Sequence, residues 1–107
     1  MNIVIEKLTT NKVFSLLEET DLLYTPALSN NVDLREYSKK LSDNADFVLC
    51  NDEEKISGYV AYYSNIEKKE LYIPLICVKQ EYQCKGLATR MLSLLENSMG
   101  GGEEEVF

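Results

Sequence analysis

The sequence predicts one α/β (α+β) domain in which helices flank a mixed, mostly antiparallel sheet. Its 107 residues are enough for one domain and too few for two. Apolar residues fall at helical spacing over much of the first half and form short strand-like runs in the second half. A nearly continuous apolar strand then leads through a short polar loop into a long amphipathic helix. Together these patterns predict a sheet that helices cover.

The first half predicts one strand and two helices. Residues 2–8 contain three β-branched residues in succession, which favours a strand. Thr9 is among the N-cap residues that precede a short helix, which we expect to reach about Glu19. Residues 21–31 contain a proline and several turn residues, so they predict a loop. Asp33 is expected to start a second helix over residues 34–43.

The second half predicts a three-stranded meander. The strands cover residues 46–50, 56–63 and 71–78, and polar turns separate them. Gly58 indicates a bulge or a close approach of two backbones inside the second of these strands. Pro74 removes a hydrogen-bond donor from the third, so we expect the pairing of that strand to be interrupted there.

A polar loop over residues 79–85 and an amphipathic helix over residues 86–98 complete the predicted pattern. The apolar stripe of that helix recurs at helical spacing. Glycines at residues 100–102 would end the helix, and residues 103–107 would begin a further strand. The buried stripe is expected to contain Leu87, Ala88, Met91, Leu92 and Leu95.

Charge and composition exclude several classes of function. The net charge is −7, with 18 acidic and 11 basic residues, so the clustered cations that bind nucleic acid are not expected. The chain has no histidine, and its three cysteines form no C-x-x-C pair. A zinc or redox centre therefore lacks its ligands, and we expect no metal. Catalysis by a Ser–His or Cys–His pair is also excluded within this chain.

The sequence also predicts a cytoplasmic protein with no membrane partner. An odd, unpaired set of cysteines suggests a reducing compartment. The first residues alternate and soon include Glu6, which is unlike the apolar centre of a signal peptide. The longest apolar run, residues 71–78, is far too short to cross a bilayer.

The loop between the last predicted strand and the last helix has the chemistry of a pyrophosphate site. The first N–H groups of a helix lack intrahelical partners and carry partial positive charge, so they bind phosphate well. Gly86 has no Cβ and would let a phosphate approach the backbone, while Ala88 keeps the first turn thin. Lys85 could add a charge and Thr89 a hydroxyl donor.

The spacing Gln83-x-x-Gly86-x-Ala88 resembles the Q/R-x-x-G-x-G/A signature of GNAT N-acetyltransferases. The order of elements is similar to that family from residue 2 to about residue 98, whereas two other phosphate motifs, G-x-x-x-x-G-K-S/T and G-x-G-x-x-G, are missing. The resemblance implies a three-layer fold and acetyl-CoA as cosubstrate. The residues that it implies for acetyl-CoA binding are Ile76, Val78, Gln83, Cys84, Lys85, Gly86, Leu87, Ala88 and Thr89.

The same resemblance implies transfer of an acetyl group to a primary amine of a small molecule. Tyr72 occupies the position at which some family members carry a glutamate base, and Glu70 is the nearest carboxylate on that face, so both are candidate catalytic residues. Other members deprotonate the amine through ordered water. Residues 24–29, together with residues 33–37, are similar to a bacterial subgroup associated with surface glycans, which makes an amino sugar our first expectation for the acceptor.

Family members continue beyond the helix with a strand, a helix and a closing strand pair, whereas this sequence ends at Phe107. We therefore expect one domain over residues 1–107 without that C-terminal part, and an exposed sheet edge that could support a homo-oligomer. One alternative function is a truncated module that binds CoA or other chains with little or no turnover. A second alternative is a nucleotide-phosphate binder that is not a transferase.

Overall fold

A computed structural model describes residues 2–65, 67–68, 70–83, 85–98 and 105–106. In these residues five strands form one sheet, in which the spatial order follows the chain. Neighbours from β1 to β4 are antiparallel, whereas the short β5 pairs in parallel with the start of β4. The predicted mixed, mostly antiparallel sheet is therefore confirmed. The strands are β1 (Asn2–Glu6), β2 (Asp46–Asp52), β3 (Lys55–Asn65), β4 (Glu70–Val78) and β5 (Glu105–Val106).

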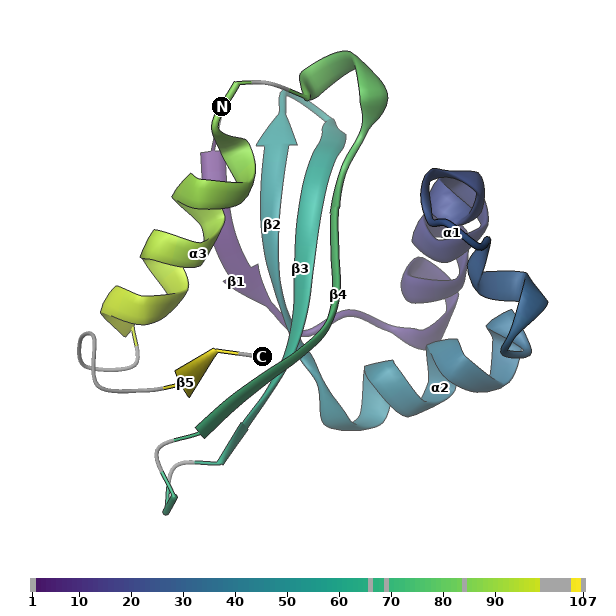
Figure 1. The fold of residues 1–107 in the computed structure, drawn as a ribbon, viewed down its shortest axis with the longest axis horizontal. Coiled ribbons are helices and arrows are strands. Elements are labelled where there is room, and N and C mark those ends of the chain that lie inside the picture. The colour runs from purple at the N-terminus through teal and green to yellow at the C-terminus, as the bar shows by residue number, and fades with distance from the viewer. Residues whose placement is uncertain (1, 66, 69, 84, 99–104, 107) are drawn as a thin grey trace.

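Helices cover both faces of the sheet (Figure 1). Helices α1 (Thr10–Thr20) and α2 (Leu34–Asn44) lie on one face, and α3 (Leu87–Ser98) lies on the other. The N-cap expected at Thr9 is present, because its side chain accepts a hydrogen bond from the N–H of Lys12 at 3.3 Å. Asp33 caps α2 in the same way, through the N–H of Glu36 at 3.0 Å.

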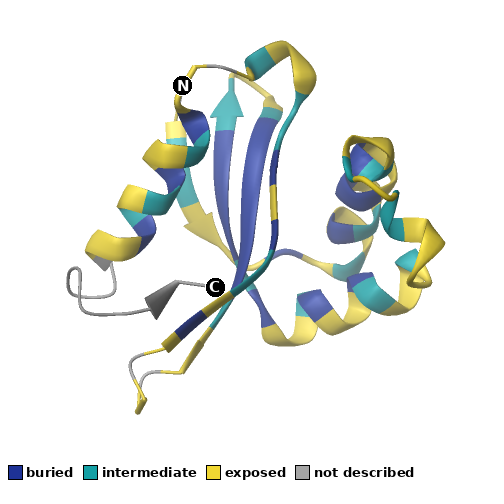
Figure 2. Ribbon diagram, viewed as in Figure 1, coloured by how far each residue is buried: buried dark blue, intermediate teal, exposed yellow. Residues whose placement is uncertain are grey.

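Two apolar cores result, one on each face, and Figure 2 shows that the middle stretches of β2 and β3 are buried. The core under α1 and α2 is built around Leu17, Leu41, Phe47 and Tyr59. The core under α3 contains Leu87, Met91 and Leu95, so the predicted stripe of that helix is present. Ala88 and Leu92 from the same expected stripe are only half-buried.

Gly58 meets both expectations for a glycine inside a strand. The register between β2 and β3 shifts beside it. Ser57 is an extra residue of β3, inserted between the two residues of β3 that pair with Cys50 and Asn51. A Cβ on Gly58 would lie 2.9 Å from the carbonyl oxygen of Cys77 on β4 and 3.3 Å from Cε of Met91 on α3. This glycine lets β3, β4 and α3 pack closely together.

The interruption predicted at Pro74 is also present, and it exchanges the two faces of β4. The two residues of β4 between Tyr72 and Leu75 lie opposite a single residue of β3, Tyr62. Because side chains alternate along a strand, one extra residue moves every later side chain to the opposite face. Leu71 therefore packs in the core under α3, whereas Leu75 packs in the core under α1 and α2.

The loops contain more local structure than the sequence predicted. Residues 21–31 were expected to be an irregular loop, but Asp21–Leu23 and Leu28–Asn30 each form one turn of 3₁₀ helix. Asp21 joins the two turns by accepting hydrogen bonds from the N–H and the hydroxyl of Ser29, at 2.8 and 2.7 Å. The loop before α3 contains a third such turn, Gln80–Tyr82. Residues 100–102, which were expected to end α3, lie outside the described residues.

Candidate functional site

The loop between β4 and α3 forms a pocket at the N-terminus of α3. Its volume is about 220 Å³. Most of the residues expected to bind the cofactor meet there, whereas Lys85 and Ile76 lie beside it and Cys84 is outside the described residues. The pocket is lined by Val78, Tyr82, Gln83, Gly86, Leu87, Ala88 and Thr89.

Gly86 is the residue that turns the chain into α3. Its φ is +72°, a left-handed conformation that costs other residues about 1–2 kcal/mol. Its carbonyl accepts the first hydrogen bond of the helix, from the N–H of Arg90 at 3.1 Å. A Cβ built on Gly86 would have no atom within 4 Å, so the space beside it is open to a ligand. The glycine is thus required by the backbone conformation rather than by crowding.

The side chain of Gln83 holds the loop against the end of β4. Its Nε2 donates a hydrogen bond of 3.0 Å to the carbonyl oxygen of Val78. Tyr82 anchors the other side of the loop, because its hydroxyl donates to Asp52 at 2.8 Å. That hydrogen bond is the main cause of the raised pKa of Tyr82. The ammonium of Lys85 lies 5.9 Å from the centre of the Tyr82 ring, within the range of a cation–π contact.

The backbone of β4 next to this loop has one paired side and one open side. The N–H of Lys79 donates to the carbonyl of Ser57 on β3 at 2.8 Å. Because backbone groups alternate along a strand, those of Ile76 and Val78 point the other way, toward the edge that β5 would continue. In the described residues β5 pairs only with Glu70 and Leu71. Among the residues that the structure describes, the edge of β4 is therefore open from the bulge at Pro74 to the pocket.

The two candidate catalytic residues lie at the other end of β4, before the bulge. Glu70 is exposed and pairs with Asn65 in the sheet. Tyr72 is 56% exposed, and its ring stacks on that of Tyr63, with centroids 6.0 Å apart and planes inclined by 12°. Tyr63 packs against the core under α1 and α2, so Tyr72 lies on that face as well.

A chain of buried hydroxyl groups, which sequence reasoning missed, joins α1, the following loop and β3. Tyr59 of β3 is fully buried. Its hydroxyl lies 2.8 Å from that of Thr20 and 2.9 Å from that of Tyr24. Burial raises the pKa of Tyr59 to about 12, and it raises the pKa of Tyr24 and of the nearby Cys77 thiol as well. All three groups are therefore neutral at pH 7.

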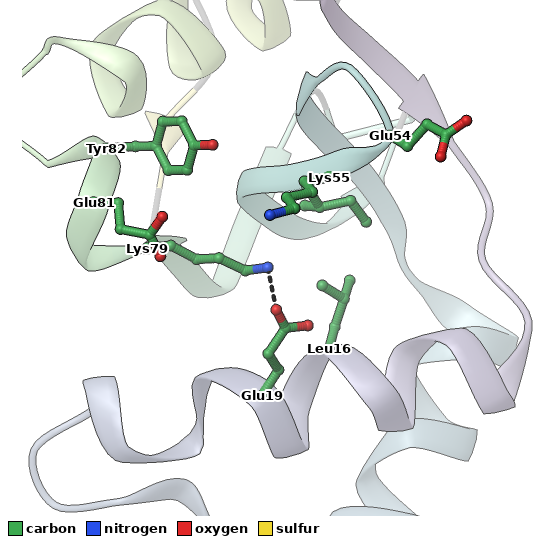
Figure 3. Close-up of a pocket in the computed structure, with 8 residues that line it drawn as sticks. Leu16, Glu19, Glu54, Lys55, Lys79, Glu81 and Tyr82 are labelled. Atoms are coloured by element: carbon green, nitrogen blue, oxygen red, sulfur yellow. Dashed lines mark hydrogen bonds and ion pairs between the residues drawn. The ribbon is translucent and has the colours of Figure 1, made fainter.

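A second hollow, of about 370 Å³, lies on the α1 side of the same loop (Figure 3). Lys79, at the end of β4, reaches across it and forms an ion pair with Glu19 of α1. Lys55 and Glu81 also line the hollow. The ion pair joins residues 60 positions apart in the sequence, and no local sequence signal could have revealed it.

Comparisons with solved structures place this fold among acetyltransferases. A possible acetyltransferase from Clostridium difficile 630 aligns with a TM-score of 0.73 and 14% identity, over 100% of this chain and 80% of that chain. A GNAT family acetyltransferase from Staphylococcus aureus gives 0.69 and 14%, over 98% of each chain. An aminoglycoside acetyltransferase from an uncultured soil metagenomic sample gives 0.63 and 23%, over 100% and 80%.

Sequence comparison gives an independent result. No curated protein matches significantly. Within the described residues no helix is long and apolar enough to span a bilayer, and no group of three or more potential metal ligands is present. Residues 12–102 match the acetyltransferase (GNAT) family. Because that match spans most of the sequence, the chain belongs to the GNAT acetyltransferase family.

Proposed function

We propose that this protein transfers an acetyl group from acetyl-CoA to a primary amine of a small molecule. The family uses acetyl-CoA as its cosubstrate. The observation that carries the proposal is the continuity of the open edge of β4 with the pocket at the N-terminus of α3. An extended pantetheine arm and a pyrophosphate need these two features side by side.

The described residues fit acetyl-CoA both at the pocket of α3 and along the open edge of β4. The N–H groups in the first turn of α3, beside Gly86, have no partners within the helix and lie at a pocket that would accept an anion. Ile76 and Val78 present backbone groups to the open edge of β4, where the pantetheine and acetyl groups would add like a strand. The carbonyl of Val78 already accepts from Gln83, so its N–H and the groups of Ile76 carry that pairing.

The neutral amine attacks the thioester carbonyl directly, the C–S bond breaks, and CoA leaves as a thiolate that takes up a proton, so no covalent enzyme intermediate forms. The enzyme contributes positioning and the polarisation of the thioester carbonyl by a backbone N–H of β4, for which Ile76 is our candidate. Tyr72 and Glu70 lie on the α2 side of β4 and are our candidates for handling the proton of the amine, directly or through water. An amino sugar remains our first candidate acceptor.

A thermal melt with acetyl-CoA, and with ATP as control, tests the cofactor site first. A ligand at a hundred times its dissociation constant adds about 2.7 kcal/mol to the stability of the folded state, which corresponds to several degrees. We expect acetyl-CoA alone to raise the melting temperature. Thiol release with a panel of primary amines then tests turnover. Equal shifts with ATP and acetyl-CoA would favour a general nucleotide binder, and a shift without thiol release would favour a module that binds CoA without catalysis.

A further inference from the structure

Three tyrosines from three different elements gather on the face of the sheet that α2 covers. Tyr63 of β3 and Tyr72 of β4 are directly opposite each other in the sheet, and their rings are nearly parallel with centroids 6.0 Å apart. Tyr72 is 56% exposed, so one face of the stack is open to solvent. Tyr37 of α2 is the third member. These three residues are called the tyrosine patch below.

Tyr37 of α2 lies near the stacked pair and packs, like Tyr63, against the core under α1 and α2. Burial raises the pKa of Tyr37, and the nearby phenols of Tyr63 and Tyr72 raise it further. Tyr37 also lines a shallow hollow of about 410 Å³ on the surface of α2, together with the carboxylates of Asp33 and Glu36.

Carboxylates lie on the elements that carry the tyrosine patch. Glu70 lies two residues before Tyr72 and so projects from the same face of β4. The hollow next to Tyr37 adds Asp33 and Glu36, against one basic residue, Lys40. The net charge of the whole chain is −7. Aromatic faces are negative, and phenol oxygens accept hydrogen bonds, so rings and carboxylates together favour a cation.

We propose that the tyrosine patch binds a second, protonated ammonium group of the acceptor, so that the acceptor is a compound with at least two amines. This inference rests on the proposed function, because it concerns the acceptor of that same reaction. The reacting amine must be neutral to attack the thioester, whereas the other amine keeps its charge and is held over the rings. An amino sugar with several amines satisfies both proposals.

Direct binding tests the tyrosine patch without turnover. The probes are choline and 3,3-dimethylbutan-1-ol, which have the same shape and differ in charge. NMR of protein labelled at its tyrosine rings follows each titration. We expect choline to shift the ring signals of the tyrosine patch and to bind roughly two- to fivefold more tightly than the neutral alcohol, the usual range for an exposed cation–π contact. Equal binding of both probes, or no shift with choline, overturns the proposal.

Matched variants separate the ring from its hydroxyl. Tyr72→Phe keeps the ring and should retain the preference for choline, whereas Tyr72→Leu should lose it. Tyr72 is exposed, so both variants should fold, and a melt checks this. Tyr82→Leu removes a tyrosine of the phosphate loop and serves as the control that should leave choline binding unchanged. Loss of choline binding in Tyr82→Leu alone would place the cation near that loop and overturn the proposal.

An activity measurement then distinguishes this proposal from the proposed function. The acceptors are 1,4-diaminobutane and 4-aminobutan-1-ol. The quantity compared is the kcat/KM of the diamine divided by that of the amino alcohol. We expect Tyr63→Leu to lower that ratio roughly two- to fivefold relative to the wild type, and Tyr63→Phe to preserve it. Turnover of both acceptors with a ratio that Tyr63→Leu leaves unchanged overturns the tyrosine patch and leaves the transferase intact. Selective choline binding without turnover of any amine would show a cation site at the tyrosine patch, but it would contradict the transferase and with it the assignment of the ammonium to an acceptor.

Discussion

The hydroxyl groups of Thr20 and Tyr59 lie 2.8 Å apart between α1 and the sheet, and the direction of their hydrogen bond can be deduced. Thr20 donates its only hydroxyl proton to the carbonyl of Leu16 at 2.7 Å. It must therefore accept from Tyr59, which in turn must accept from Tyr24. The protons of both tyrosines are thus committed to the interior, which disfavours either residue as the acid that protonates the leaving thiolate.

Breaking this chain should cost stability. In Thr20→Val the buried hydroxyl of Tyr59 loses its acceptor, and a buried polar group without a partner costs about 1–3 kcal/mol. Urea denaturation should show a loss of that size. Tyr59→Phe removes the partner, so the double variant should be less destabilised than the sum of the two single variants. Strict additivity would contradict the hydrogen bond.

Stability should fall at high pH. Folding raises the pKa of Tyr59 from 10 to about 12, so between these values the unfolded chain loses this proton while the folded chain keeps it. Because the unfolded state then binds fewer protons than the folded state, the free energy of unfolding falls as the pH rises. The contribution of Tyr59 is complete below pH 10 and should fall by about 2–3 kcal/mol by pH 12. Urea denaturation of the wild type and of Tyr59→Phe across this range measures it, and equal slopes would contradict the assignment.

Gly86→Ala should weaken acetyl-CoA binding. The φ of +72° is unfavourable for alanine, by about 1–2 kcal/mol. Since a Cβ there would touch no atom of the described residues, we expect the strain and the blocked approach to the helix N-terminus to be the main direct effects. Thermal melts should show a slightly less stable protein with a smaller shift on adding acetyl-CoA. An unchanged shift would place the pyrophosphate elsewhere.

Single residues with a special backbone conformation or a capping side chain made much of the fold predictable. Pro74 and Gly58 marked the two irregular places in the sheet, and Thr9 and Asp33 marked the starts of two helices. The exchange of faces in β4 was not predictable, because a continuous apolar run contains no alternation from which to read a face.

The candidate site was predictable only in part, for a similar reason. The Gln83–Gly86 spacing is local, so the pocket at α3 could be anticipated. The tyrosine patch and the Lys79–Glu19 ion pair join elements far apart in the sequence, and only tertiary packing brings them together. The same holds for the buried hydroxyl chain from Thr20 to Tyr24.

Gly58→Ala should destabilise the protein without abolishing the pocket at α3. The added Cβ would lie 2.9 Å from the carbonyl oxygen of Cys77, a backbone atom that can move only with β4. Overpacking of this kind usually costs about 1–3 kcal/mol, which a thermal melt would detect. The contact with Met91 at 3.3 Å is the milder one, because a flexible side chain can yield. Adding Met91→Leu should therefore recover little of the loss, whereas full recovery would show that α3, rather than β4, sets the limit at Gly58.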